Sequence, residues 1–237
     1  MKYLGIIPAR GGSKGIIQKN LQPLGGRPLI AWTIDAANAC RELDHVIVST
    51  DCQQIADTAR SFGADVPFMR PPELSTDTAT SFDAVCHAVD NVFGYDAMVL
   101  LQPTSPLRSA TDLSHAIQHF ESSGASSLVS VCPASKHPNW MKTIDANGKL
   151  HAYQEQITAT RRQDLKPVYA LNGAIYISKI DAMRSSGSIV TDDAVAFVMP
   201  PDKSHDIDTE IDLKICEMLL RHQQSTDDRP HPLRPQH

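Results

Sequence analysis

Basic residues and glycines gather in one short stretch near the start of the chain. Residues 8–20 contain Arg10, Lys14 and Lys19, together with three glycines within five positions. Glycine has no Cβ to keep an anion away, and backbone N–H groups between a strand and a helix can point toward a phosphate. The spacing matches neither the Walker A pattern nor the dinucleotide fingerprint. It predicts a triphosphate site, with a solvated surface turn as the alternative.

Two acidic residues near the other end of the chain could hold a metal ion. Asp206 and Asp208 are two positions apart, so in an extended chain both carboxylates point to one side and Ile207 to the other. Converging carboxylates repel each other unless a cation lies between them. We expect Mg²⁺, which prefers oxygen ligands and is often shared between carboxylates and phosphates. The alternative is a pair of solvated loop residues before a helix that Thr209 and Asp212 cap.

A third polar segment follows the most apolar strand expected in the chain. Residues 96–101 are nearly all apolar, and residues 102–108 begin with Gln102 and end with Arg108. This strand should be central, and ligands of open α/β sheets bind at the carboxyl ends of the strands. We therefore expect Gln102 and Arg108 at the rim of the cleft that receives the glycine-rich loop.

The scaffold for these residues follows from an alternation of strand-like and helix-like segments. Short apolar runs bounded by turn residues indicate buried strands, and apolar spacings of three and four indicate helices. The pattern predicts an α/β fold with a mostly parallel central sheet covered on both faces. The expected strands are residues 2–7, 44–51, 66–69, 96–101, 127–131, 172–177 and 195–199. The expected helices are residues 28–37, 55–62, 80–93, 111–121, 180–184 and 209–220.

The alternation breaks between residues 133 and 167. Asn147-Gly148 predicts a hairpin turn between two short strands. About 35 residues cannot bury enough apolar surface alone, so we interpret this segment as an antiparallel excursion of a single domain, residues 1–223. Residues 224–237, rich in proline and charge, are predicted to be a mobile tail.

Composition excludes several classes of protein. The 237 residues are 41% hydrophobic and 21% charged, as in ordinary globular domains, and the net charge of −5 argues against a nucleic-acid surface. The five cysteines are scattered and form no Cys-x-x-Cys pair, which favours buried thiols in a reducing cytoplasm. A signal peptide is not expected, because the first residues enter a strand without a charged segment and a long apolar run. A membrane span is not expected, because no apolar run approaches ~18 residues.

The motifs together resemble the acylneuraminate cytidylyltransferases, also called CMP-sialic acid synthetases. The resemblance covers residues 3–220 and rests on four segments in order, residues 7–20, 100–108, 172–176 and 206–208. It implies a Rossmann-like nucleotidyltransferase with a three-layer sandwich. It also implies that CTP and a nonulosonic acid yield a CMP-sugar and pyrophosphate with the help of Mg²⁺. The antiparallel excursion is implied to help form a homodimer.

The same resemblance assigns roles to individual residues. Arg10, Lys19, Asp206 and Asp208 are implied to be catalytic, and the two aspartates are implied metal ligands. The residues implied for CTP are Ala9, Arg10, Gly11, Lys14, Asn20, Arg70 and Ser81. The residues expected on the sugar acid are Gln102, Arg108, Lys142, Arg162 and Tyr176. The base that accepts the proton of the sugar hydroxyl stays open, and Asp206 or Asp208 could serve.

Several substrate alternatives stay open. Residues 172–176 resemble the neuraminate- and legionaminate-activating branches rather than the pseudaminate branch. Ala170 stands where many members carry arginine, and Ile17-Gln18 replaces a proline and a basic residue. An octulosonate cytidylyltransferase is the nearest rival. A nucleotide-binding regulatory module without turnover is the rival from another class.

Overall fold

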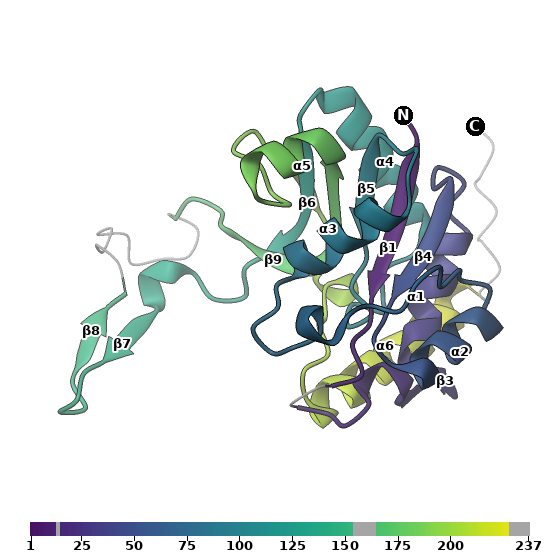
Figure 1. Ribbon diagram of the computed structural model, residues 1–237. Coiled ribbons are helices and arrows are strands. Elements are labelled where there is room, and N and C mark those ends of the chain that lie inside the picture. Colours follow the sequence, from purple (N-terminus) through teal and green to yellow (C-terminus); the bar gives the residue numbers. More distant parts are fainter. Residues whose placement is uncertain (13–14, 154–164, 228–237) are drawn as a thin grey trace, which may run out of the picture.

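A central six-stranded sheet dominates the computed structural model, which describes residues 1–12, 15–153 and 165–227 (Figure 1). The strand order is β10-β6-β9-β5-β1-β4. The strands of this sheet are β1 (Tyr3–Pro8), β4 (His45–Ser49), β5 (Ala97–Leu100), β6 (Ser127–Pro133), β9 (Tyr169–Lys179) and β10 (Val195–Val198). Only β9 runs antiparallel to its neighbours, which are β5 and β6. The predicted mostly parallel sheet is confirmed, with its most apolar strand, β5, in the interior.

Helices cover both faces of this sheet. The helices are α1 (Leu29–Asn38), α2 (Gln53–Ser61), α3 (Ser81–Asn91), α4 (Ala110–Ser123), α5 (Ile180–Ser186) and α6 (Glu210–Asp227). Apolar side chains of α1, α2 and α4 pack into one core, and those of α3 and α5 pack into a second core on the opposite face. A third, smaller core joins α6 to the start of α1 and to Leu107 and Ile207. The three-layer sandwich is therefore confirmed.

The segments that differ from the predictions do so for local reasons. Residues 66–69 form no strand. The chain makes only two isolated bridges here, from Asp65 to Ile47 of β4 and from Met69 to Thr50 just after β4, and Pro67 between them has no N–H to donate. The last helix continues to Asp227, so the boundary predicted at residue 223 falls inside α6. The rest of the predicted tail, residues 228–237, lies outside the described residues.

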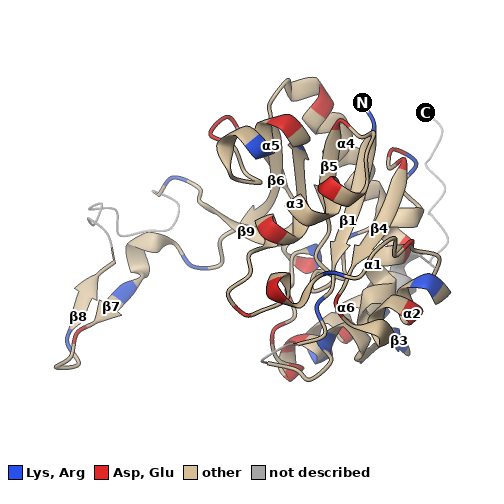
Figure 2. Ribbon diagram, viewed as in Figure 1, with Lys and Arg blue, Asp and Glu red and all other residues tan. Residues whose placement is uncertain are grey.

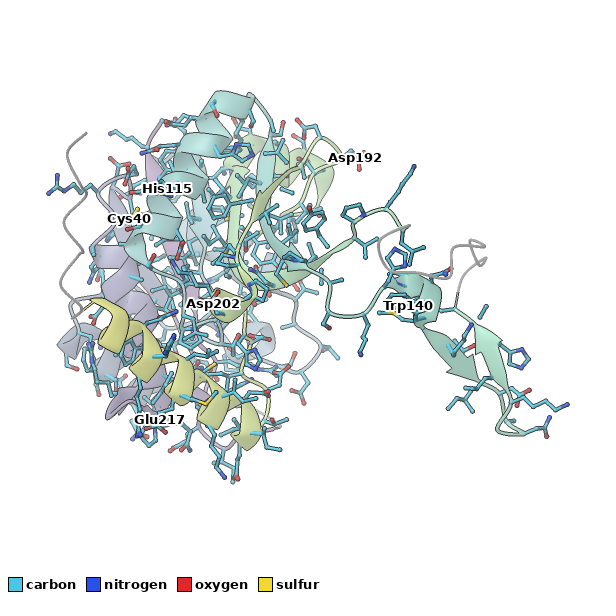
Figure 3. The ribbon with its side chains drawn as sticks, turned by 180° about the vertical axis from the view of Figure 1, so that it is seen from behind. Cys40, His115, Trp140, Asp192, Asp202 and Glu217 are labelled. Carbon is cyan, nitrogen blue, oxygen red and sulfur yellow. The ribbon has the colours of Figure 1, made fainter. Side chains whose placement is uncertain are left out.

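The predicted excursion is an arm that extends away from the sheet (Figure 1). It carries a hairpin of β7 (Lys142–Ile144) and β8 (Leu150–Ala152). In the loop between these strands, Asp145 accepts hydrogen bonds from the N–H groups of Asn147 and Lys149. Figure 3, seen from behind, shows Trp140 on this arm, clear of the main body. A second small pair, β2 (Pro23–Leu24) and β3 (Arg27–Pro28), precedes α1.

Three general expectations can be compared with the structure. All five cysteines are free thiols, and two of them are buried. Among the described residues, Lys and Arg are interspersed with Asp and Glu and do not gather on one face (Figure 2). Within the same residues, no helix has the length and apolar content needed to cross a membrane.

Candidate active site

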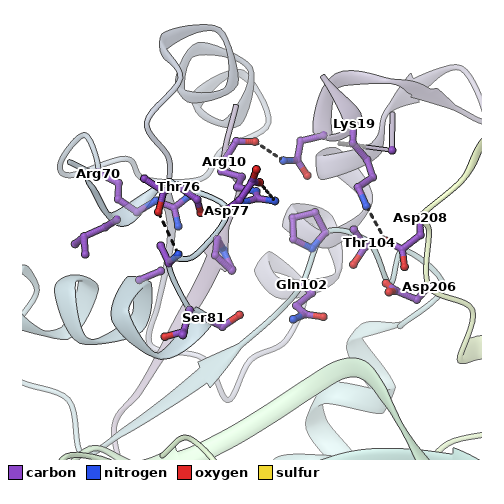
Figure 4. Close-up of a pocket in the computed structure, with 18 residues that line it drawn as sticks. Arg10, Lys19, Arg70, Thr76, Asp77, Ser81, Gln102, Thr104, Asp206 and Asp208 are labelled. Carbon is purple, nitrogen blue, oxygen red and sulfur yellow. Dashed lines mark hydrogen bonds and ion pairs between the residues drawn. The ribbon is translucent and has the colours of Figure 1, made fainter. Parts of the chain in front are cut away.

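An open cavity of about 600 Å³ lies at the carboxyl ends of β1 and β5. Five segments line it: the glycine-rich loop, residues 19–20, residues 70–84, residues 102–104 and residues 206–208. Figure 4 shows Arg70 and Ser81 at one end, Lys19, Asp206 and Asp208 at the other, and Gln102 between them. The three segments singled out in the sequence therefore meet in one cavity, as the position of ligand sites in α/β sheets predicts.

The start of the glycine-rich loop is fixed by β4. The Ala9 N–H donates to the carbonyl of Ser49 at 2.9 Å, and the Gly11 N–H donates to Asp51 Oδ1 at 2.8 Å. A Cβ on Gly11 would lie 2.9 Å from the Cβ of Cys52, so the loop packs directly against the residues that follow the strand. Ala9 and Gly11, both predicted for CTP, are not part of the cavity lining. The N–H of Gly11 is already used by Asp51.

Arg10 and Asn20 do line the cavity. The Asn20 side chain is buried and its Nδ2 donates to the Arg10 carbonyl at 3.1 Å, which holds the backbone of the loop. The Arg10 guanidinium donates to the carbonyl of Thr76 at 2.9 Å and lies 3.2 Å from Asp77 Oδ1. Lys14, also predicted for CTP, lies outside the described residues.

The end of the same loop touches the acidic segment. A Cβ on Gly15 would lie 2.4 Å from the carbonyl oxygen of Asp208, so only glycine permits this approach. Lys19 crosses the same junction, where its Nζ donates to the Ile207 carbonyl at 2.7 Å and to Asp208 Oδ1 at 3.0 Å. Residues almost 190 positions apart in the sequence thus form one surface.

The two predicted metal ligands face the cavity together. Ile207 between them is fully buried, and its N–H donates to the Thr104 carbonyl at 2.9 Å. Burial raises the pKa of Asp206 and the charge of Asp208 raises it further, although a hydrogen bond from Thr104 and the charge of Lys19 act the other way. A divalent cation would relieve this repulsion, and two carboxylates with added phosphate oxygens are a donor set that suits Mg²⁺. No cluster of three metal-ligating side chains occurs among the described residues.

Arg70 is a buried cation at the opposite end of the cavity. Arg70 lines the cavity yet is only 6% exposed, and its Nε and Nη2 have no hydrogen-bond partner among the residues that the structure describes. Burial lowers the pKa of Arg70, and the nearby charge of Asp51 opposes that shift. Ser81, the first residue of α3, lines the cavity beside it. Buried donors without partners are rare in proteins, so this end is built to receive acceptor atoms.

Arg108 corrects the expectation of a sugar contact at the rim. It is 3% exposed, donates from Nη1 to the Ala174 carbonyl at 2.6 Å and from Nη2 to Thr33 Oγ1 at 2.9 Å, and does not line the cavity. Burial lowers the pKa of Arg108 to about 9, and Asp112 opposes the shift. Arg108 thus anchors the β9 backbone at Ala174, while Gln102 remains in the cavity lining.

The other predicted sugar residues are dispersed. Tyr176 on β9 packs against the core on the sheet face covered by α3 and α5, and it is not part of the cavity lining. Burial and the charge of Asp206 raise the pKa of Tyr176. Lys142 is exposed on the arm, away from the cavity of its own chain (Figure 1). Arg162 lies outside the described residues. Among the described residues predicted for the sugar acid, only Gln102 lines this cavity.

Four residues at or beside the site were missed in the sequence. Gly15 and Thr104 belong to the quoted motifs, and the turn-forming residues that end β4 could have drawn attention to Asp51. Asp77 lies in a polar loop, residues 75–80, whose composition alone gives no sign of a cavity.

Comparison with known proteins agrees with this arrangement. A family model described as "Cytidylyltransferase" matches residues 4–220. CMP-N,N'-diacetyllegionaminic acid synthase of Legionella pneumophila is 37% identical in an alignment of 234 positions that covers 93% of this chain and 97% of that protein. N-acylneuraminate cytidylyltransferase of Streptococcus agalactiae is 38% identical over 90% of this chain, which spans about half (52%) of that longer protein.

A solved structure gives the corresponding match in fold. It is described as CMP:2-keto-3-deoxy-manno-octonic acid synthetase complexed with CTP, and it superposes with a TM-score of 0.73. The match covers 94% of this chain and 100% of the other, at 17% sequence identity. At that identity the likeness concerns the fold alone.

The unpartnered donors of Arg70 generate the first prediction. Arg70→Met should weaken binding of CTP, the nucleotide expected from the sequence, by about tenfold or more, because hydrogen bonds to charged groups contribute roughly 1.5–3 kcal/mol. The free energy of unfolding should stay the same or rise, since a buried charge with unpaired donors is removed. Calorimetric titration and urea denaturation measure the two quantities.

Arg60→Met is the control for that variant. Arg60 donates to the Val66 carbonyl on the outer side of α2, away from the cavity lining. It should leave CTP binding unchanged. Unaltered CTP binding in Arg70→Met, together with a large loss of stability, would show that Arg70 is a structural residue.

Proposed function

The chain belongs to the cytidylyltransferase family, and from this premise we propose that it activates a nonulosonic acid. The reaction is CTP plus an acylneuraminate or legionaminate, giving the CMP-sugar and pyrophosphate. The observation that carries the proposal is one cavity with buried, unpaired Arg70 donors at one end and paired carboxylates beside Lys19 at the other. Such a cavity suits an extended nucleoside triphosphate whose phosphates lie toward the carboxylates.

Six of the lining residues are assigned a task in this reaction. Arg70 and Ser81 hold the nucleoside, and Arg10 and Lys19 bind phosphate oxygens and stabilise the negative charge on departing pyrophosphate. The anomeric hydroxyl oxygen attacks the α-phosphorus, the bond between the α-phosphorus and the bridging oxygen breaks, and the hydroxyl proton passes to a base. Asp206 and Asp208 would hold Mg²⁺, which supplies Lewis-acid neutralisation of phosphate charge when bound.

The first test of this function is pyrophosphate release with CTP and Mg²⁺. N-acetylneuraminate, diacetyllegionaminate, pseudaminate and 3-deoxy-octulosonate are supplied in parallel. We expect turnover with one of the first two, in keeping with residues 172–176. A preference for pseudaminate or 3-deoxy-octulosonate would show that the proposed substrate is wrong and identify the actual one. Tight CTP binding without release from any of them would favour the regulatory module.

The metal assignment predicts the behaviour of Asp208→Ala. Turnover should fall by about 100-fold or more, and the Mg²⁺ concentration for half-maximal rate should rise, because one ligand is lost. The melting temperature should change little, since the Asp208 side chain is 76% exposed. Glu210→Ala, an exposed acidic residue two positions later, is the control and should keep wild-type turnover. Near-normal rates in Asp208→Ala would refute the assignment.

We also propose that the arm joins two copies of the chain. Its hairpin extends away from the main body of the described chain and exposes Ile144 (70%) and Leu150 (68%), whereas an isolated two-stranded hairpin has marginal stability. A second copy would bury these side chains and bring Lys142 to the neighbouring cavity.

Light scattering tests the proposed dimer. The wild-type protein should have twice the mass of one chain, and Ile144→Asp should shift it to a monomer with lower turnover. Phe93→Asp, at an equally exposed apolar side chain outside the arm, should stay dimeric. A monomeric wild-type protein would exclude the arrangement.

A further inference from the structure

Asp77 lines the cavity and has no task in the reaction proposed above. It lies in the loop between the short 3-10 turn Pro72–Leu74 and α3. Its Oδ1 is 3.2 Å from Arg10 Nη2, and the neighbouring carbonyl of Thr76 accepts from Arg10 Nη1 at 2.9 Å. The guanidinium proposed to bind phosphate is therefore held by two oxygen atoms of this loop (Figure 4).

The charge balance of the cavity explains why this contact is informative. Among its described lining residues, Arg10, Lys19 and Arg70 are positive, and Asp77, Asp206 and Asp208 are negative. Over these described residues the positive and negative charges are equal in number. Bound Mg²⁺ would compensate the charges of Asp206 and Asp208. Asp77, in contrast, lies beside Arg10 and away from those two carboxylates (Figure 4).

We propose that Asp77 is a displaceable counter-ion of Arg10. In the free protein it holds the guanidinium at the cavity, and a polyphosphate takes its place. The Arg10 and Asp77 side chains are 36% and 50% exposed, so their pairing is screened by water and contributes little. An arginine bound to phosphate makes stronger, bidentate hydrogen bonds. The inference rests on the proposed function, since it needs a polyphosphate ligand.

The exchange has the same consequence for substrate and product. Asp77 competes with CTP for Arg10 on binding, and it pairs with Arg10 again when pyrophosphate leaves. It therefore lowers the affinity for both anions. The turn of this loop is also closed by the Ala79 N–H, which donates to Thr76 Oγ1 at 3.2 Å and to the Thr76 carbonyl at 3.3 Å.

Calorimetric titration of Asp77→Asn with CTP and with inorganic pyrophosphate, each with Mg²⁺, tests the inference. Kd should fall by about threefold to fivefold for both anions, the upper part of the range expected when a partly exposed competing ion pair is removed. Asp35→Asn is a matched control, because the Arg27–Asp35 pair is exposed to a similar degree (36% and 46%) and lies outside the cavity lining. It should leave both Kd values within twofold of wild type.

The double variant Arg10→Met/Asp77→Asn separates the counter-ion role from a general charge effect. Compared with Arg10→Met alone, it should show no gain in affinity, since Asp77 acts through Arg10. Equal gains with and without Arg10 would overturn the inference, and so would unchanged or weaker binding in Asp77→Asn. Failure of the wild-type protein to bind CTP would instead overturn the proposed function.

Discussion

The close contact between Gly15 and the carbonyl of Asp208 is the constraint on which the site depends. A built Cβ would lie 2.4 Å from that oxygen, so the loop can reach the acidic segment only through a glycine. Three further interactions keep the acidic segment in place: Ile207 is fully buried, its N–H bonds to Thr104, and Thr209 and Asp212 cap α6. The predicted phosphate-binding and metal-binding groups are therefore positioned by backbone contacts and buried side chains.

Much of this arrangement can be predicted from local sequence. Alternating apolar runs gave the strands and helices of the sandwich, and spacing alone placed Asp206 and Asp208 on one side with Ile207 in the core. The capping box at Thr80 and Asp83, which starts α3 beside the cavity, is also a local pattern. Each of these features depends on residues within a few positions of one another, which is the range over which such patterns are reliable.

The features that could not be predicted depend on distant partners. Arg108 follows a strand end, like Gln102, but Thr33 and the Ala174 carbonyl bind it beneath the surface. A buried arginine and an exposed one look identical in a sequence. Gly11 belongs to the same motif as residues that line the cavity, but its N–H donates a hydrogen bond to Asp51. A motif therefore predicts where the backbone goes better than it predicts which groups remain available for a ligand.

The distribution of cations has a consequence for the second substrate. Arg10, Lys19 and Arg70 are the cations of the described cavity lining, and all three are assigned to the nucleotide. A nonulosonic acid carries a carboxylate that needs a positive partner of its own. Lys142, one of the described residues expected on the sugar acid, lies on an arm that extends away from its own cavity. A second copy that supplies this arm would add the missing charge, so the proposed dimer and the proposed substrate support each other.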